Sequence, residues 1–201
     1  MKMLKLSGLL ALMIIMCSCP ATDPYKYVNY CLWLIFQDTS GNDLVKGIEM
    51  KAWWPSNASP DENYYGGEVT DSLYTLATTF SEPCDRWGGV IRKGGGLLPD
   101  ENGIGLGKIR YKDYHVAILG FSFPIGQCPE IKNLTYHLKC PYIFGDDEIH
   151  EFVTYWEIPR IGSKDQVSAK CYNMEFDDKV ITGITYIDSD KISFIKIILD
   201  K

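Results

Sequence analysis

The residues of this chain best suited to acid–base or metal chemistry are three histidines, His115, His137 and His150. A zinc site usually takes its ligands at short local spacings such as H-x-x-x-H, and no two of these histidines stand that close. Residues 146–151 surround His150 with carboxylates, which suit calcium, but their spacing matches no EF-hand loop. We therefore predict no metal site and interpret residues 146–151 as the solvated tip of a hairpin.

A catalytic nucleophile needs a Ser or Cys in a suitable turn, with a base beside it. The chain has no Gly-x-Ser-x-Gly sequence, and no cysteine has a recognisable catalytic signature. The cysteines beyond Cys19 are Cys31, Cys84, Cys128, Cys140 and Cys171. A Cys–His pair assembled by the fold stays open, as does the choice between buried thiols and one or two disulfides. On the sequence alone we predict no enzyme and no catalytic residue.

A glycine-rich segment at residues 103–108 is superficially similar to a phosphate-binding loop. A P-loop has Ser or Thr directly after its Lys and leads into a helix. Here Ile109 follows Lys108, and the next segment alternates as a strand does. We therefore predict neither nucleotide binding nor any cofactor.

Four large aromatic residues flank a polar loop at residues 55–63, namely Trp53, Trp54, Tyr64 and Tyr65. Aromatic side chains at loop edges can stack on sugar rings or anchor a protein partner. Large aromatics more often contribute to burial, so these four can instead cover an open end of a core. They are the candidate binding residues of the sequence, with both interpretations open.

The beginning of the chain has the pattern of a targeting segment. Two lysines precede an apolar run at residues 6–16, which is shorter than the roughly 20 residues of a membrane-spanning helix. Ser18 and Cys19 follow, and a small residue before a cysteine at this place resembles the lipobox of bacterial lipoproteins. The resemblance implies cleavage before Cys19 and lipidation of its thiol, with Cys17 as the alternative acceptor. A plain secretory signal is the other interpretation.

Charge limits the class of partner. Cleavage before Cys19 would remove two lysines and leave 18 basic against 26 acidic residues, a net charge of about −8. Such a charge disfavours nucleic acid and electrostatic adhesion to anionic lipid. Attachment to a membrane is therefore expected through the lipid anchor.

The chain also contains a short sequence pattern for the attachment of a glycan. Asp71, Ser72 and Leu73 resemble the Asp-Ser/Thr-aliphatic tripeptide of protein O-glycosylation in Bacteroidetes. The resemblance makes Ser72 a candidate O-glycosylation site.

Alternation and turn residues predict that strands position all of these side chains. Residues 27–36 are nearly continuous in apolar and aromatic residues, as in a central strand buried on both faces. The turn at 38–43 and the alternation of 44–54 predict a first hairpin. Residues 134–140 have the clearest period of two. One or two strands are expected at 68–80, and further strands at 90–92, 108–112, 114–123, 151–158, 167–176, 179–187 and 191–199.

About nine to ten strands with turn signals between them, and no convincing amphipathic helix, predict an all-β fold. We expect a β-sandwich, immunoglobulin-like or transthyretin-like, with a related barrel as the alternative. The expected organisation is a signal peptide at 1–18, a lipidated tether at 19–26 and a single β-sandwich domain at 27–201.

The lipobox, the size of the chain and the segment at residues 140–156 look like small uncharacterised lipoproteins of gut Bacteroidetes, which are grouped as domains of unknown function. The resemblance implies export and attachment to the outer membrane, with the surface and periplasmic faces both open. Three functions follow as hypotheses. The first is a module that binds an envelope protein or a glycan. The second is a structural or assembly component of a surface fibre or envelope complex, and the third is an enzyme of unknown reaction.

Overall fold

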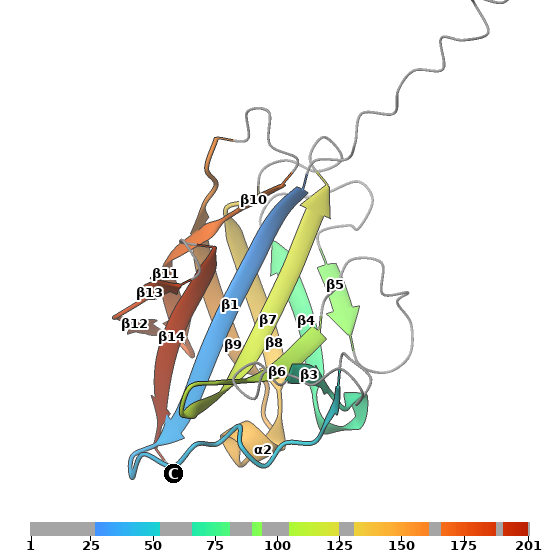
Figure 1. Cartoon of the computed structure of the whole chain (residues 1–201), viewed down its shortest axis with the longest axis vertical. Helices are drawn as coiled ribbons and strands as arrows, with labels where there is room; N and C mark the ends of the chain where they lie inside the picture. The colour runs from blue at the N-terminus through green and yellow to red at the C-terminus, as the bar shows by residue number, and fades with distance from the viewer. Residues whose placement is uncertain are drawn as a thin grey trace, which may run out of the picture.

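A computed structural model of the chain describes residues 27–52, 66–80, 90–93, 105–124, 131–160, 166–187 and 191–200. In these ranges the protein is nearly all β, with two sheets that are not closed into a barrel (Figure 1). The predicted β-sandwich is confirmed. The described ranges hold fourteen strands, because the segments at 68–80, 167–176 and 179–187 each form two strands.

The larger sheet has eight strands, of which β10 (Gln166–Ser168) pairs with the start of β1. The others follow in the order β13 (Thr185–Ile187), β14 (Ile192–Leu199), β1 (Tyr27–Asp38), β7 (Tyr114–Pro124), β6 (Gly105–Tyr111), β3 (Gly66–Val69) and β2 (Met50–Ala52). The six strands of the smaller sheet follow in the order β12 (Lys179–Ile181), β11 (Lys170–Phe176), β9 (His150–Glu157), β8 (Asn133–Lys139), β4 (Thr75–Phe80) and β5 (Val90–Lys93).

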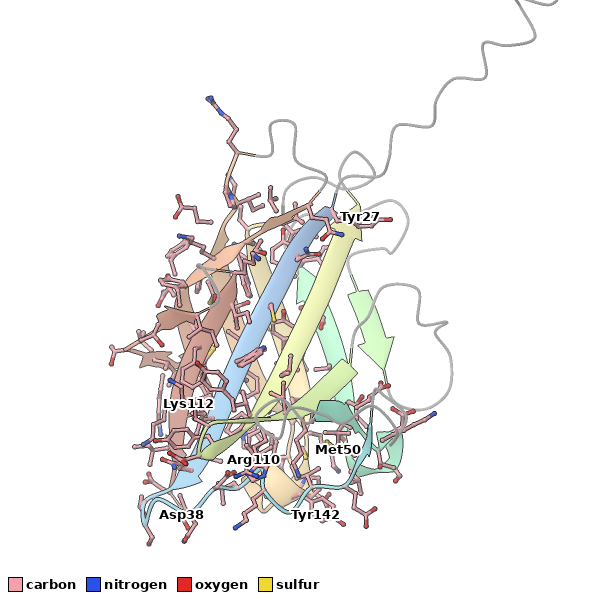
Figure 2. All side chains as sticks on the ribbon, in the orientation of Figure 1. Tyr27, Asp38, Met50, Arg110, Lys112 and Tyr142 are labelled. Carbon is pink, nitrogen blue, oxygen red and sulfur yellow. The ribbon has the colours of Figure 1, made fainter. Side chains whose placement is uncertain are left out.

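The sandwich has two ends, which strand β1 connects. Tyr27 begins β1 at what we call the proximal end, and Asp38 ends it at the distal end (Figure 2). The distal end also holds Tyr142, which belongs to the one-turn helix α2 (Pro141–Phe144). β14 runs parallel to β1, so Leu199 also lies at the distal end.

Strand β1 is buried on both faces, as its apolar sequence predicted. Tyr30, Leu32 and Phe36 belong to the core between the sheets. Trp33 and Ile35 alternate with them and belong to a second apolar cluster on the other face of the larger sheet. Both faces of β1 therefore contribute to stability, in proportion to the apolar area removed from water.

Strand β8 supplies the other clear confirmation of a sequence pattern. Leu134, Tyr136 and Leu138 point into the core and are no more than 1 % exposed, while their neighbours are partly exposed. The period of two continues to Cys140, which is also buried. Cross-strand neighbours from β4 and β9 complete this side of the core.

The predicted first hairpin is wrong in its second half. The turn at 38–43 does form, since the Gly41 amide donates to the Asp38 carbonyl and the Leu44 amide to the Phe36 carbonyl. The chain then leaves β1 and pairs as β2 with β3. β14 occupies one edge of β1 as far as Asp38, and β7 occupies the other edge from Tyr27 to Leu34. Only the last residues of β1 are left for the returning chain, and there Gln37 and Asp43 form a single bridge.

Two polar side chains fix the departure from β1. The Asp43 carboxylate accepts hydrogen bonds from the amides of Val45, Lys46 and His115 at 2.9, 3.1 and 2.9 Å. The Lys108 ammonium donates to the carbonyls of Lys46 and Ile48, both at 2.7 Å. Lys108 is only 6 % exposed. A buried lysine is tolerated because its donors are used in this way.

The helices of the described residues are short. The 3-10 helix η2 (Asp71–Leu73) separates β3 from β4, and α2 lies between β8 and β9. No helix in the described ranges has the length and apolar character needed to cross a membrane.

Candidate functional site

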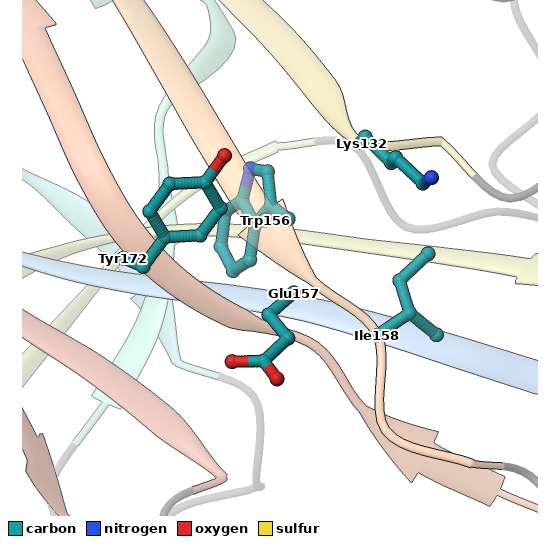
Figure 3. A pocket seen from close by; sticks show the side chains of 5 residues that line it. All are labelled: Lys132, Trp156, Glu157, Ile158 and Tyr172. Carbon is teal, nitrogen blue, oxygen red and sulfur yellow. The ribbon is translucent and has the colours of Figure 1, made fainter.

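A hollow of about 490 Å³ opens on the smaller sheet where β8 begins and β9 ends, at the proximal end (Figure 3). This volume lies within the range of roughly 300–1,000 Å³ that is usual for small-ligand sites. Its lining residues are Lys132, Trp156, Glu157, Ile158 and Tyr172. Two aromatic rings and two opposite charges thus converge on one surface depression.

Trp156 forms the fixed part of the hollow, because it is only 2 % exposed and is held by contacts on several sides. Its ring meets the Tyr30 ring edge-on, with centroids 5.2 Å apart. Its indole N–H donates to the Thr154 hydroxyl at 2.6 Å, and that hydroxyl donates to the Leu134 carbonyl at 2.7 Å. An indole with its one donor satisfied and its ring packed keeps a single orientation.

Tyr172 forms the exposed part of the hollow. In the ladder between β9 and β11, Cys171 pairs with Trp156 and Asn173 with Tyr155, so Tyr172 is the extra residue of a β-bulge. A bulge changes the direction of a side chain. The Tyr172 side chain accordingly leaves the alternation and is 58 % exposed.

The backbone at this bulge is held by the larger sheet. The Cys171 amide donates to the Ser193 hydroxyl at 3.0 Å, and the Tyr186 hydroxyl donates to the Cys171 carbonyl at 3.2 Å. Both partners come from strands of the opposite sheet, β14 and β13. The position of Tyr172 is therefore determined by packing across the whole sandwich.

Charged side chains complete the rim. Lys132 and Glu157 are both exposed, and Ile158 is partly buried and packs against the core. In Figure 3 the Lys132 side chain lies on the opposite side of Trp156 from Tyr172. The Trp156 amide donates to the Lys132 carbonyl at 2.7 Å, which ties the two sides of the rim together. The hollow thus combines an aromatic surface with one cationic donor and one anionic acceptor.

The three histidines lie away from the hollow, towards the distal end, and each contacts a carboxylate. His115 Nδ1 is 2.9 Å from Asp43 Oδ2, and His137 Nδ1 is 3.5 Å from Glu151 Oε2. His150 contacts two carboxylates, with Nδ1 2.6 Å from an Asp177 oxygen and Nε2 3.1 Å from an Asp146 oxygen. The described residues hold no group of three or more His, Cys, Asp or Glu side chains placed to bind a metal ion.

His150 is a structural link between two turns. Its ring lies against the Phe144 ring, with centroids 3.9 Å apart and the two planes tilted by 31°. Burial alone would lower the pKa of His150, but the hydrogen bonds and charges of Asp177 and Asp146 outweigh it, so the pKa is raised. Asp177 has a positive φ of 46°, which Asp tolerates better than most residues, and its carboxylate also accepts the Glu151 amide at 2.9 Å.

The cysteines of the described residues are thiols. Cys140 and Cys171 are buried, and Cys31 is partly buried. Burial raises the pKa of Cys31 to about 11 and that of Cys171 to about 12. These two thiols therefore stay protonated and unreactive near neutral pH. Cys84 and Cys128 lie outside the described residues.

The other predicted site residues divide into two groups. The lipidation residues Cys17 and Cys19 and the four aromatics at 53, 54, 64 and 65 lie outside the described residues. Ser72 lies within η2 and is exposed, so it is accessible for modification, and O-glycosylation there stays a prediction.

The hollow was missed from the sequence, although one signal for it exists. In the segment that forms β11 the inward residues are Cys171, Met174 and Phe176, so the first spacing is three residues where a regular strand has two. That irregularity indicates a bulge, and the residue that it displaces is an aromatic one. The contact between Trp156 and Tyr30, by contrast, is visible only in the folded chain.

Comparison with known proteins gives no match to any family model, to any curated protein or to any solved structure.

Proposed function

We propose that the chain is a lipid-anchored protein of the cell envelope whose β-sandwich binds a glycan in the hollow around Tyr172. The observation that carries the proposal is that one hollow is lined by the fixed, buried Trp156 and the exposed Tyr172, together with Lys132 and Glu157. The lipid anchor is argued from Ser18 and Cys19, and the outer membrane from the resemblance to Bacteroidetes lipoproteins.

A sugar ring matches this surface chemically. Its C–H faces pack against aromatic rings, and its hydroxyls both donate and accept hydrogen bonds. Tyr172 offers a ring to stack on, Lys132 donates and Glu157 accepts. Since the bulge and Trp156 are held by contacts within the fold, the site needs little ordering when a ligand binds.

The test is a glycan-binding screen of the mature chain, followed by calorimetry on the glycans retained. We expect Tyr172→Ala to lower affinity at least tenfold, a change of about 1.4 kcal/mol. Tyr142→Ala is a matched control, because Tyr142 is 59 % exposed and lies at the distal end. Equal affinity of the two variants, or no glycan retained by the wild-type protein, would contradict the proposal.

The anchor needs its own measurement. Metabolic labelling with a fatty-acid analogue should mark the wild-type protein and fail to mark Cys19→Ser. Labelling that persists in Cys19→Ser and is lost in Cys17→Ser would show that Cys17 is the lipidated residue.

A further inference from the structure

Strand β1 follows directly on the segment that would tether the sandwich, and it is paired on both edges. β7 pairs with it from Tyr27 to Leu34 on one edge. On the other edge β10 pairs with its first residues, Tyr27 to Asn29, and β14 pairs with Leu32 to Asp38. Every residue of β1 is thus paired on at least one edge, in the middle of the larger sheet (Figure 1).

Side chains resist movement of β1 along its own axis. Leu32 and Leu34 occupy the inter-sheet core and are 0 % exposed, while Ile35 on the other face is 1 % exposed. The Tyr30 hydroxyl donates to the Ile131 carbonyl at 2.8 Å, beside the smaller sheet. A slip of one residue would exchange the faces of every side chain, and a slip of two would require all of them to leave close-packed positions together.

We propose that β1 is a mechanical clamp, which lets the sandwich carry tension between an attachment at its N-terminal side and a load on its body. A pull toward the proximal end acts along the axis of β1. The ladder hydrogen bonds lie across that axis, so a pull in this direction loads them together rather than one after another. The physiological use of the clamp rests on the proposed lipid anchor, whereas the mechanical property does not.

The relation between β1 and β14 makes the clamp directly measurable. The two strands are parallel and paired from Leu32–Ser193 to Asp38–Leu199. Pulling β1 from its proximal end and β14 from its distal end slides these neighbours in opposite directions. Pulling at two paired residues of the proximal end instead separates β1 from β10 one pair at a time.

The experiment is single-molecule unfolding of the mature chain carrying Cys19→Ser, so that no lipid is present. In the first geometry the two handles are attached at the two ends of the chain. In the second, one handle stays at the N-terminal end and the other is attached to an azide-bearing residue in place of Gln166, which is exposed and pairs with Tyr27. We expect a rupture force at least about twofold higher in the first geometry at equal loading rate.

Two core variants distinguish an effect on the mechanical clamp from a general loss of folding stability. Ile195→Ala removes a residue of β14 that pairs with Leu34, and Leu138→Ala removes a residue of β8, which does not pair with β1. Both side chains are 0 % exposed. After correction for the stability of each variant in urea, only Ile195→Ala should lower the end-to-end rupture force. Equal forces in the two geometries, or an equal drop for the two variants, would overturn the proposal.

Discussion

The proximal and distal ends of the sandwich use polar side chains in different ways. At the distal end the titratable groups contact one another, as in Asp43 with His115 and in His150 with Asp146 and Asp177. At the hollow the charged side chains of Lys132 and Glu157 are exposed at a rim whose aromatic floor is fixed. Polar groups that bond within the fold hold turns in place, whereas exposed ones around a rigid apolar surface are available to a ligand.

The largest effect should come from the floor of the hollow. Trp156→Ala removes a buried ring and leaves a cavity beside Tyr30, so we expect a loss of about 3–5 kcal/mol in the free energy of unfolding. Urea unfolding measures this loss, and glycan binding should disappear with it. Trp33→Ala, on the other face of the larger sheet, should also destabilise but leave binding by the folded fraction intact. Glycan binding that survives Trp156→Ala would show that the hollow at the proximal end is not the binding site.

A smaller loss is expected from the polar network of the distal end. Lys108→Met keeps most of the aliphatic stem but leaves the buried carbonyls of Lys46 and Ile48 without this donor. Unfolding in urea should show a loss of about 1–3 kcal/mol. The same variant should bind glycan as the wild-type protein does, because Lys108 belongs to the larger sheet and does not line the hollow. Weakened binding would mean that the ends are coupled.

The histidine at the distal end should make stability depend on pH. The pKa of His150 is raised in the folded protein above its unfolded value of about 6.5. Its contribution is therefore fully present below pH of about 6.5 and is lost as the pH rises through the folded pKa. As the pH rises from about 6 to about 8, the urea concentration at the unfolding midpoint should therefore decrease. We expect this decrease to be smaller than the decrease caused by Trp156→Ala or by Lys108→Met.

His150→Gln should remove most of this pH dependence. His137→Gln serves as the control, because His137 contacts one carboxylate at 3.5 Å where His150 contacts two. An unchanged pH profile in His150→Gln would show that the link between the two turns does not depend on its charge.

The smallest effect on stability is expected at the exposed wall of the hollow. Tyr172→Ala and Tyr142→Ala remove side chains that are 58 % and 59 % exposed, so each should change the free energy of unfolding by no more than about 0.5 kcal/mol. Thermal unfolding checks this. A large loss in Tyr172→Ala alone would make its ring a structural element of the bulge and remove it from the binding site.

Local pattern sufficed for the parts of the fold that depend on one strand at a time. The period of two predicted β8, and the nearly continuous apolar run predicted that β1 is buried on both faces. The strands expected at 108–112 and 114–123 also form, as β6 and β7. These features depend on side-chain spacing, which the sequence contains directly.

The remainder depends on which distant strands meet. Residues 44–54 alternate well enough for a hairpin, yet β7 and β14 already occupy the edges that such a hairpin would use. The hollow likewise joins Lys132, Trp156 and Tyr172, and its floor rests on Tyr30 from the opposite sheet. The binding residues predicted from the sequence, at 53, 54, 64 and 65, belong to another part of the chain, outside the described residues, and stay a prediction.

The pairing of β1 with β14 also bears on how the chain acquires its structure. Leu32 pairs with Ser193, and Leu34 pairs with Ile195. Strand β1, which is synthesised early, can therefore pair along this edge only after β14 has been synthesised, close to the end of the chain. Such non-local pairing slows folding, and in the meantime the largely apolar strand β1 is incompletely covered. A ribosome-stalled or C-terminally truncated chain should consequently be aggregation-prone and depend on a chaperone until β14 arrives.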